Sequence, residues 1–318
     1  MRILFMGTPD FAVPTLQTLI ASEHEVIGVV TQPDRPKGRG GKMQYSPVKE
    51  TALQADIPVY QPDKVKDEAF IHVMRDISPD VIVVVAFGQI LSEELLHIPY
   101  YGCINVHASL LPKLRGPAPI QWSVINGDVE SGVTIQQMDK GIDTGDILAV
   151  KKYTLDEKET GGSLFERLSQ LGGALLLEVL KDAEAGTLHP VPQKHEEHTY
   201  AGMLSKATGA MDFSKSAAEL ERLVRGLNPW PSAFCYINGK MLKIWEADVI
   251  EERNLSEPER QKAPGTVICA EKEAFIVRAS QGALRITSLQ LEGKKRMSAD
   301  DFLRGYSIDT GTVLRKER

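Results

Sequence analysis

The chain has 318 residues, of which 42% are hydrophobic and 25% charged, a composition typical of a globular protein with one large and one smaller domain. This composition excludes a disordered, collagen-like or disulfide-stapled chain, and no apolar run approaches the roughly 18 residues of a transmembrane helix. Cys103, Cys235 and Cys269 are too far apart for a CxxC pair and suit a reducing compartment, so we expect a cytoplasmic protein that contacts no membrane. The opening run MRILFMGTPDF predicts a first strand rather than a secretory signal.

The net charge of −6 is unevenly distributed along the sequence. Residues 206–318 carry a balance of +3, which leaves −9 on residues 1–205. A mildly basic C-terminal part favours contact with a polyanion, although chance explains the split as well when it is taken alone.

Strands and helices alternate along the first 185 residues. Strands are predicted over 2–6, 24–31, 57–60, 80–87, 102–108, 132–138 and 146–153, and helices after Gly7, from Ser46-Pro47, and near 66–76, 117–126 and 162–185. Ser46 and Pro47 are typical of an N-cap and a first helical residue, and Pro58 restricts its strand to an edge or a strand start. The alternation predicts crossover connections and a parallel sheet covered by helices on both faces.

The pattern changes after residue 185. The segment 186–205 contains three histidines, but no cysteine or third strong ligand completes a metal-site spacing, so we interpret it as a linker. Beyond it, a helix near 216–226 and short runs at 233–237, 241–249, 265–269, 274–279 and 283–291 predict a small antiparallel barrel or sandwich, and Ser298 begins a last short helix. The predicted domains are 1–189 and 207–318, joined by a linker at 190–206.

The strongest local feature is the run Asn105-Val106-His107 at the end of a predicted strand. Positions i and i+2 of a strand share a face, so the Asn105 amide and the His107 imidazole emerge side by side. This pair suits a reaction that builds negative charge on a carbonyl oxygen while a nucleophile loses a proton. The alternative is a polar pair that satisfies hydrogen bonds, but the carboxyl end of a strand favours a catalytic role.

A tight acidic loop, Met138 to Asp146, lies between the next two predicted strands. We expect a carboxylate of this loop to reach His107, orient the ring and stabilise its protonated form. A plain hairpin with solvated aspartates is the alternative, and it would be preferred if the loop stood alone.

The loop 32–42 is long for a compact fold and contains four cations, Arg35, Lys37, Arg39 and Lys42. These cations predict phosphate binding as the loop becomes ordered, and a solvated flexible loop is the equal alternative. The first strand-to-helix turn, at Gly7, lacks the GxGxxG spacing, so a dinucleotide enzyme is not indicated.

On these residues, the chain resembles the methionyl-tRNA formyltransferase family over essentially its whole length. The resemblance rests on MGTPDFAVPTL, TQPDRPKGRGGK, NVHASLLPKLRGPAPIQWSVINGD, GIDTGDIL and RGLNPWPSAF. The Asn-x-His, SLLP and Asp pattern is similar to that of folate-dependent formyltransferases in general. The basic loop and the RGLNPWP segment narrow the resemblance to the enzymes that act on tRNA.

The resemblance implies transfer of a formyl group from 10-formyltetrahydrofolate to the α-amine of methionyl initiator tRNA, which gives N-formylmethionyl-tRNA. It places Asn105, His107 and Asp143, rather than Asp146, at the catalytic positions and requires no metal. The folate-binding positions that it implies are Ser109, Leu110, Leu111 and Pro112. It also implies a Rossmann-like α/β N-terminal domain of the formyltransferase type, with a parallel sheet, and a smaller C-terminal OB-like β-barrel.

The densest basic cluster of the C-terminal part is Lys294-Lys295-Arg296. We predict that these side chains bind tRNA phosphates, although three adjacent cations are more often a solvated turn. Residues 207–318 are expected to contribute affinity for tRNA but no chemistry, in a protein that acts as a monomer.

Two other functions remain open at this point. A formyltransferase for an aminosugar nucleotide or another small amine would share the three catalytic residues without needing the basic loop or the C-terminal barrel. A non-catalytic RNA-binding module would need neither Asn105 nor His107, and a formyl-transfer assay separates it from the enzymes.

Overall fold

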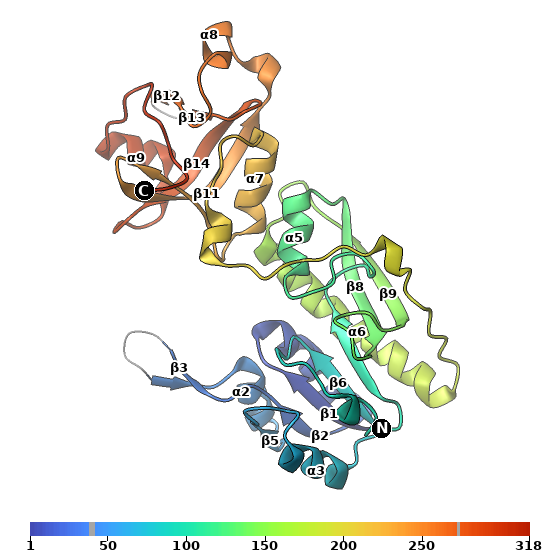
Figure 1. Cartoon of the computed structure of the whole chain (residues 1–318). Helices are drawn as coiled ribbons and strands as arrows, with labels where there is room; N and C mark the ends of the chain where they lie inside the picture. The colour runs from blue at the N-terminus through green and yellow to red at the C-terminus, as the bar shows by residue number, and fades with distance from the viewer. Residues whose placement is uncertain (38–41, 272–273) are drawn as a thin grey trace. The chain divides into compact units, whose positions relative to one another are not determined.

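The computed structural model describes residues 1–37, 42–271 and 274–318 and divides them into two units (Figure 1). Unit 1 comprises Met1–Pro119, Glu130–Thr154 and Phe165–Gly202, and unit 2 comprises Ile120–Val129, Leu155–Leu164 and Met203–Arg318.

Unit 1 is built on a seven-stranded sheet. Its strands are β1 (Arg2–Gly7), β2 (Glu25–Val30), β5 (Val59–Tyr60), β6 (Val81–Val85), β7 (Cys103–His107), β8 (Glu130–Gln137) and β9 (Ile147–Thr154), in the order β5-β2-β1-β6-β7-β8-β9. The predicted parallel pairing is confirmed from β5 to β7, whereas β8 and β9 are antiparallel to their neighbours. The loop of nine residues between β8 and β9 is too short for a crossover, so those two strands form a hairpin.

Helices cover both faces of this sheet. They are α1 (Val13–Ile20), α2 (Pro47–Gln54), α3 (Glu68–Ile77), α4 (Glu93–Leu96) and α6 (Gly161–Ala185). Leu4 and Met6 of β1 pack with the apolar faces of α3 and α4. On the opposite face, a Cβ added at Gly172 of α6 would lie 2.7 Å from Val106 Cγ1, so this glycine allows the helix to approach β7 closely.

The first residues of α2 and α1 explain where these two helices begin. Ser46 is the N-cap of α2 and its hydroxyl accepts a hydrogen bond from the Lys49 backbone N–H, as predicted. Pro14 lies in the first turn of α1, where a backbone N–H would have no acceptor within the helix, so proline costs no hydrogen bond there. The short hairpin of β3 (Arg35–Lys37) and β4 (Lys42–Gln44), which the sequence did not indicate, projects from the sheet (Figure 1).

Unit 2 contains an antiparallel β domain. Its strands are β10 (Ala233–Ile237), β11 (Lys240–Ile250), β12 (Val267–Glu271), β13 (Ala274–Arg278), β14 (Ala283–Leu291) and β15 (Met297–Ser298), and its helices are α5 (Pro119–Asn126), α7 (Ala217–Gly226), α8 (Glu257–Arg260) and α9 (Ala299–Gly305). Both edge strands contact the C-terminal segment: Tyr236 of β10 pairs with Arg315, and Val267 of β12 exchanges backbone hydrogen bonds with Gly311 and Thr312. The C-terminal segment thus bridges the two edge strands, and the predicted antiparallel β domain is confirmed.

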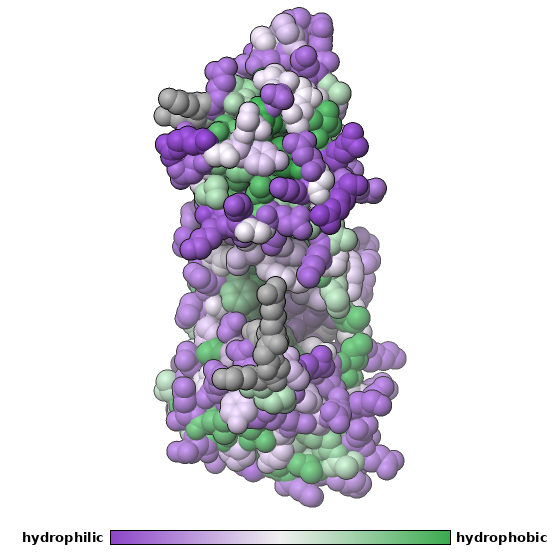
Figure 2. Space-filling view, turned by 90° about the vertical axis from the view of Figure 1, so that its left-hand side faces the viewer, coloured by the Kyte–Doolittle hydropathy of each residue, from purple (hydrophilic) through white to green (hydrophobic). Residues whose placement is uncertain are grey.

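On the face drawn in Figure 2, hydrophilic side chains predominate and hydrophobic ones form small separate groups. Among the described residues, none of the helices combines the length and the apolar character that crossing a membrane requires. The same residues contain no cluster of three His, Cys, Asp or Glu side chains suited to hold a metal ion.

Candidate active site

Strand β7 carries the first two site residues, as predicted from their spacing. Asn105 and His107 lie on one face of this strand, and Val106 between them points to α6. β7 is flanked by β6 on one side and β8 on the other, so its carboxyl end lies well inside the sheet rather than at an edge. His107 is buried there, with 6% of its surface exposed.

The Asp143 carboxylate joins these two side chains. Its Oδ1 lies 3.5 Å from His107 Nδ1 and accepts hydrogen bonds from Asn105 Nδ2 at 3.3 Å and Gln136 Nε2 at 2.8 Å. Its Oδ2 accepts from the Gly116 backbone N–H at 2.8 Å. Three donors and an imidazole thus surround one carboxylate and fix its position at the end of β7.

The imidazole of His107 has an acceptor at each nitrogen. Nε2 donates to the Leu114 carbonyl oxygen at 3.0 Å, while Nδ1 faces Asp143. The neutral ring therefore carries its proton on Nε2, and when the ring is protonated both nitrogens face an acceptor. This arrangement suits a group that accepts a proton during a reaction and releases it afterwards.

Gln136 is a site residue that the sequence analysis did not identify. It lies on β8 directly opposite Asn105 in the antiparallel ladder and is 1% exposed. Its amide donates to Asp143 Oδ1, whereas Gly116 donates to Oδ2. Only the pairing of β7 with β8 brings it to the site, and no motif in the sequence signals that register.

The run Ser109–Pro112 follows β7 directly and is anchored on β8. Thr134 Oγ1 donates to the Ser109 carbonyl at 2.6 Å and accepts from the Leu111 backbone N–H at 3.1 Å. Ser109 and Leu111 are buried, whereas Leu110 and Pro112 are partly exposed. The Ser109 hydroxyl donates to the Lys113 carbonyl, so among the described contacts it is not paired with His107 as a nucleophile would be.

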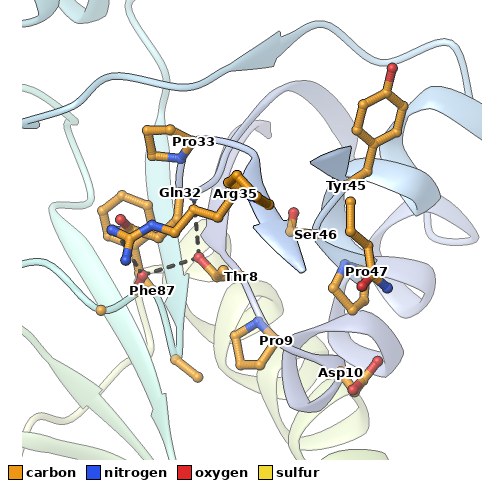
Figure 3. Close-up of a pocket in the computed structure, with 14 residues that line it drawn as sticks. Thr8, Pro9, Asp10, Gln32, Pro33, Arg35, Tyr45, Ser46, Pro47 and Phe87 are labelled. Carbon is orange, nitrogen blue, oxygen red and sulfur yellow. Dashed lines mark hydrogen bonds between the residues drawn. The ribbon is translucent and has the colours of Figure 1, made fainter. Parts of the chain in front are cut away.

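A cavity of about 640 Å³ opens at the carboxyl ends of β1, β2 and β6. The chain leaves β1 toward β2 on one side, and β6 lies on its other side, so the cavity is at the point where the strand order reverses. Figure 3 shows Arg35 reaching across Gln32 toward Phe87, with Thr8 below and Tyr45 at the far rim. The sheet register pairs Val84 of β6 with Asn105 of β7, and Ala86 of the cavity wall is the residue that follows β6.

An ion pair holds the base of the β3–β4 hairpin beside this cavity. Lys49 Nζ of α2 donates to Asp34 Oδ2 at 2.5 Å and to Gln61 Oε1 at 2.7 Å, and it lies 4.0 Å from the centre of the Tyr45 ring. The hydrogen bond from Lys49, with one from Gln61, lowers the pKa of the Asp34 carboxyl. The hairpin stem is therefore fixed to unit 1 at its root.

The structure describes the side chain of only one of the four predicted phosphate-binding cations of the loop 32–42. Arg35 lines the cavity and is exposed. Lys37 and Lys42 belong to the hairpin strands, but their side chains and the whole of Arg39 lie outside the described residues.

The predicted C-terminal cluster lies in unit 2. Arg296 Nη2 pairs with Glu246 Oε1 at 2.5 Å, and its Nε donates to Ser288 Oγ at 2.9 Å. Lys294 and Lys295 are exposed on the turn that precedes β15.

Comparisons with known proteins identify the family of this chain. The formyl transferase family matches residues 1–180, and the formyl transferase C-terminal domain matches residues 203–307. The methionyl-tRNA formyltransferase of Lachnospira eligens is 56% identical over 99% of both chains, and that of Clostridioides difficile is 48% identical over 99% of this chain and 100% of its own.

Solved structures share the fold at low sequence identity. The sugar 3N-formyl transferase WlaRD is 19% identical with a TM-score of 0.65 and covers 93% of this chain and 99% of its own. HypX from Aquifex aeolicus, in complex with tetrahydrofolic acid, is 19% identical with a TM-score of 0.59 and covers 98% of this chain and 50% of its own. By its family matches and its relatives of equal extent, the chain belongs to the methionyl-tRNA formyltransferase family.

Proposed function

We propose that this chain transfers the formyl group of 10-formyltetrahydrofolate to the α-amine of methionyl initiator tRNA. The observation that carries the proposal is the cluster of Asn105, His107 and Asp143 around one carboxylate oxygen at the end of β7. Relatives of equal extent bear the name of this activity, and a structural neighbour binds tetrahydrofolic acid.

The reaction joins the amine nitrogen to the formyl carbon and breaks the bond between that carbon and N10 of the folate. One proton leaves the amine and one arrives at N10, so tetrahydrofolate departs neutral at that nitrogen. The Asn105 amide donates to the oxygen of the tetrahedral intermediate, where negative charge develops. His107 takes the amine proton, directly or through one water, and returns it to N10.

Asp143 organises the other two groups. Its contact with Nδ1 stabilises the imidazolium that forms when His107 accepts a proton. Its hydrogen bond with Asn105 Nδ2 sets the orientation of that amide. The carboxylate therefore stabilises the positive charge that develops on His107 in the transition state. It also orients the amide of Asn105, which donates to the oxyanion.

The folate is assigned to the run after β7. Leu110 and Pro112 offer partly exposed apolar surface in the run that follows His107 along the chain, while the backbone of the same run is held on β8 through Thr134. A pterin donor in this position would present its formyl group to the end of β7, where the three polar groups converge.

The acceptor end of the tRNA is assigned to the cavity beside β1 and β6. The amine must reach His107 at the end of β7, the strand that pairs with β6 beside the cavity, and we assign the terminal phosphates to Arg35 and the hairpin. The methionyl ester and terminal adenosine connect these two positions, and a cavity of about 640 Å³ accommodates a group of that size.

We expect Gln44→Trp to raise the KM for methionyl-tRNA about tenfold, because an indole in the cavity costs on the order of 1.4 kcal/mol of binding. Gln44 lines the cavity, whereas its neighbour Met43 does not, so Met43→Trp is the matched control. Steady-state kinetics with varied tRNA measure the effect. A rise in the KM for the formyl donor instead would show that the cavity holds the folate.

Neutralising Lys294 and Lys295 together should weaken tRNA binding and flatten its salt dependence. Each lost phosphate contact lowers the slope by roughly one unit, while turnover at saturating tRNA should hardly change. Lys262→Gln, an exposed lysine of the same unit, is the control. An unchanged salt slope would show that these two lysines lie in a solvated turn and do not contact tRNA phosphates.

The function itself is tested by a formylation assay with three acceptors: methionyl initiator tRNA, methionyl elongator tRNA and free methionine. Transfer to the initiator tRNA alone is the expected result. Transfer to an aminosugar nucleotide, with none to tRNA, would favour the small-amine enzyme. No transfer to any amine would favour an RNA-binding module.

A further inference from the structure

A buried glutamine from the segment between the two family domains contacts the loop that carries Asp143. Gln193 is 5% exposed, and its Nε2 donates to the Asp143 carbonyl at 3.0 Å and to the Gly145 carbonyl at 2.7 Å. Its Oε1 accepts from Arg115. The orientation of this amide is unambiguous, because a guanidinium only donates and a carbonyl only accepts.

The loop held by Gln193 has an uncommon backbone. Asp143 adopts a left-handed conformation with φ of +53°, which a non-glycine residue rarely takes. A Cβ at Gly145 would lie 1.7 Å from the Gln137 carbonyl oxygen, so the chain passes there with no room for a side chain. Gln193 holds the carbonyl of Asp143 itself and that of Gly145, two residues further on, so it fixes the backbone from which the Asp143 carboxylate projects.

Arg115 connects this clamp to the other side of the same carboxylate. Its Nε and Nη2 donate to Gln193 Oε1 at 3.1 and 2.7 Å, and the guanidinium is buried, with the residue 6% exposed. The next residue, Gly116, donates its backbone N–H to Asp143 Oδ2. One dipeptide therefore sets the side chain of Asp143 directly and its main chain through Gln193.

The segment around Gln193 is itself fixed to unit 1. Val191 exchanges two backbone hydrogen bonds of 2.8 Å with Ile147 at the start of β9. Further along, the backbone of Arg115 donates to the Thr199 carbonyl at 2.9 Å and accepts from the Ala201 N–H at 2.7 Å. Gln193 thus lies between two anchored points and has little freedom to leave the loop.

We propose that Gln193 is a positioning residue for formyl transfer, which holds the left-handed turn at Asp143 so that the carboxylate faces Asn105 and His107. The proposal rests on the catalytic role assigned to Asp143. Gln193 does not touch the reacting groups, so its effect passes through the geometry of that carboxylate alone.

The test is Gln193→Glu, which keeps the shape of the side chain and strengthens its contact with Arg115. It removes the two N–H donors and places a carboxylate oxygen against the Asp143 and Gly145 carbonyls. We expect kcat to fall about 10- to 100-fold. The KM for both substrates should change little, because Gln193 touches neither substrate, and the melting temperature should fall modestly, because two buried carbonyls lose their donor. The variant is therefore assayed per folded molecule below its melting temperature. Lys194→Gln, an exposed neighbour paired with Glu197, is the matched control.

A double-mutant cycle with Asp143→Asn separates positioning from general damage. If Gln193 acts through Asp143, the double variant is no slower than Asp143→Asn alone, whereas an independent effect would multiply. Gln193→Met, assayed per folded molecule below its melting temperature, is the second variant. Full kcat in both Gln193 variants, or multiplied losses in the cycle, would overturn the proposal.

The catalytic role of Asp143 and the positioning role of Gln193 can be contradicted by different results. Full activity of Asp143→Asn would remove the assigned role of Asp143 whatever Gln193 does. An inactive Asp143→Asn with fully active Gln193 variants would overturn the positioning role alone.

Discussion

Asn105→Ala and His107→Ala should each lower kcat about 10²- to 10³-fold, the cost of removing one preorganised donor or proton acceptor from a transition state. Asn105 supplies the amide that faces the developing oxyanion, and His107 supplies the only buried imidazole that contacts Asp143 among the described residues. Single-turnover formylation, with saturating methionyl-tRNA and formyl donor, measures the chemical step itself.

The fold should survive both changes. Asn105 is half-buried and its amide makes one described hydrogen bond, to Asp143. Removing His107 leaves the Leu114 carbonyl without a donor, which costs about 1–3 kcal/mol and lowers the melting temperature modestly. Near-normal turnover in a folded variant would contradict the role assigned to that residue.

Asp143→Asn should impair turnover about 10²-fold or more, whereas Asp146→Asn should leave it nearly intact. The asparagine removes the charge that stabilises the protonated His107. It also replaces one oxygen by an NH₂ group, so either the hydrogen bond from the Gly116 N–H is lost or those from Asn105 and Gln136 are, depending on the orientation of the amide.

Asp146 is the matched control because it is only three residues away on the same loop. Its backbone carbonyl accepts from the Gln137 N–H at 2.8 Å, a contact that the asparagine keeps. Within the described chain, its carboxylate makes no hydrogen bond or ion pair. Equal losses in the two variants would mean that the loop as a whole, rather than the Asp143 carboxylate, is needed for catalysis.

Local patterns were enough to predict most of the elements and the first catalytic pair. The i, i+2 rule of a strand places Asn105 and His107 on one face without any knowledge of the fold. Ser46 and Pro47 predict the start of α2, and the apolar run at β6 predicts a buried central strand. These signals are carried by neighbours in the sequence, so they can be interpreted one segment at a time.

Contacts between distant segments were decided only by the tertiary structure. The antiparallel register of β8 on β7 puts Gln136 opposite Asn105, and the path of residues 191–201 over unit 1 buries Gln193 against the Asp143 loop. A lone glutamine carries no charge, periodicity or spacing that distinguishes it from a solvated one. Its role depends on carbonyls and a guanidinium 48 to 78 residues away, which only the folded chain brings within hydrogen-bonding distance.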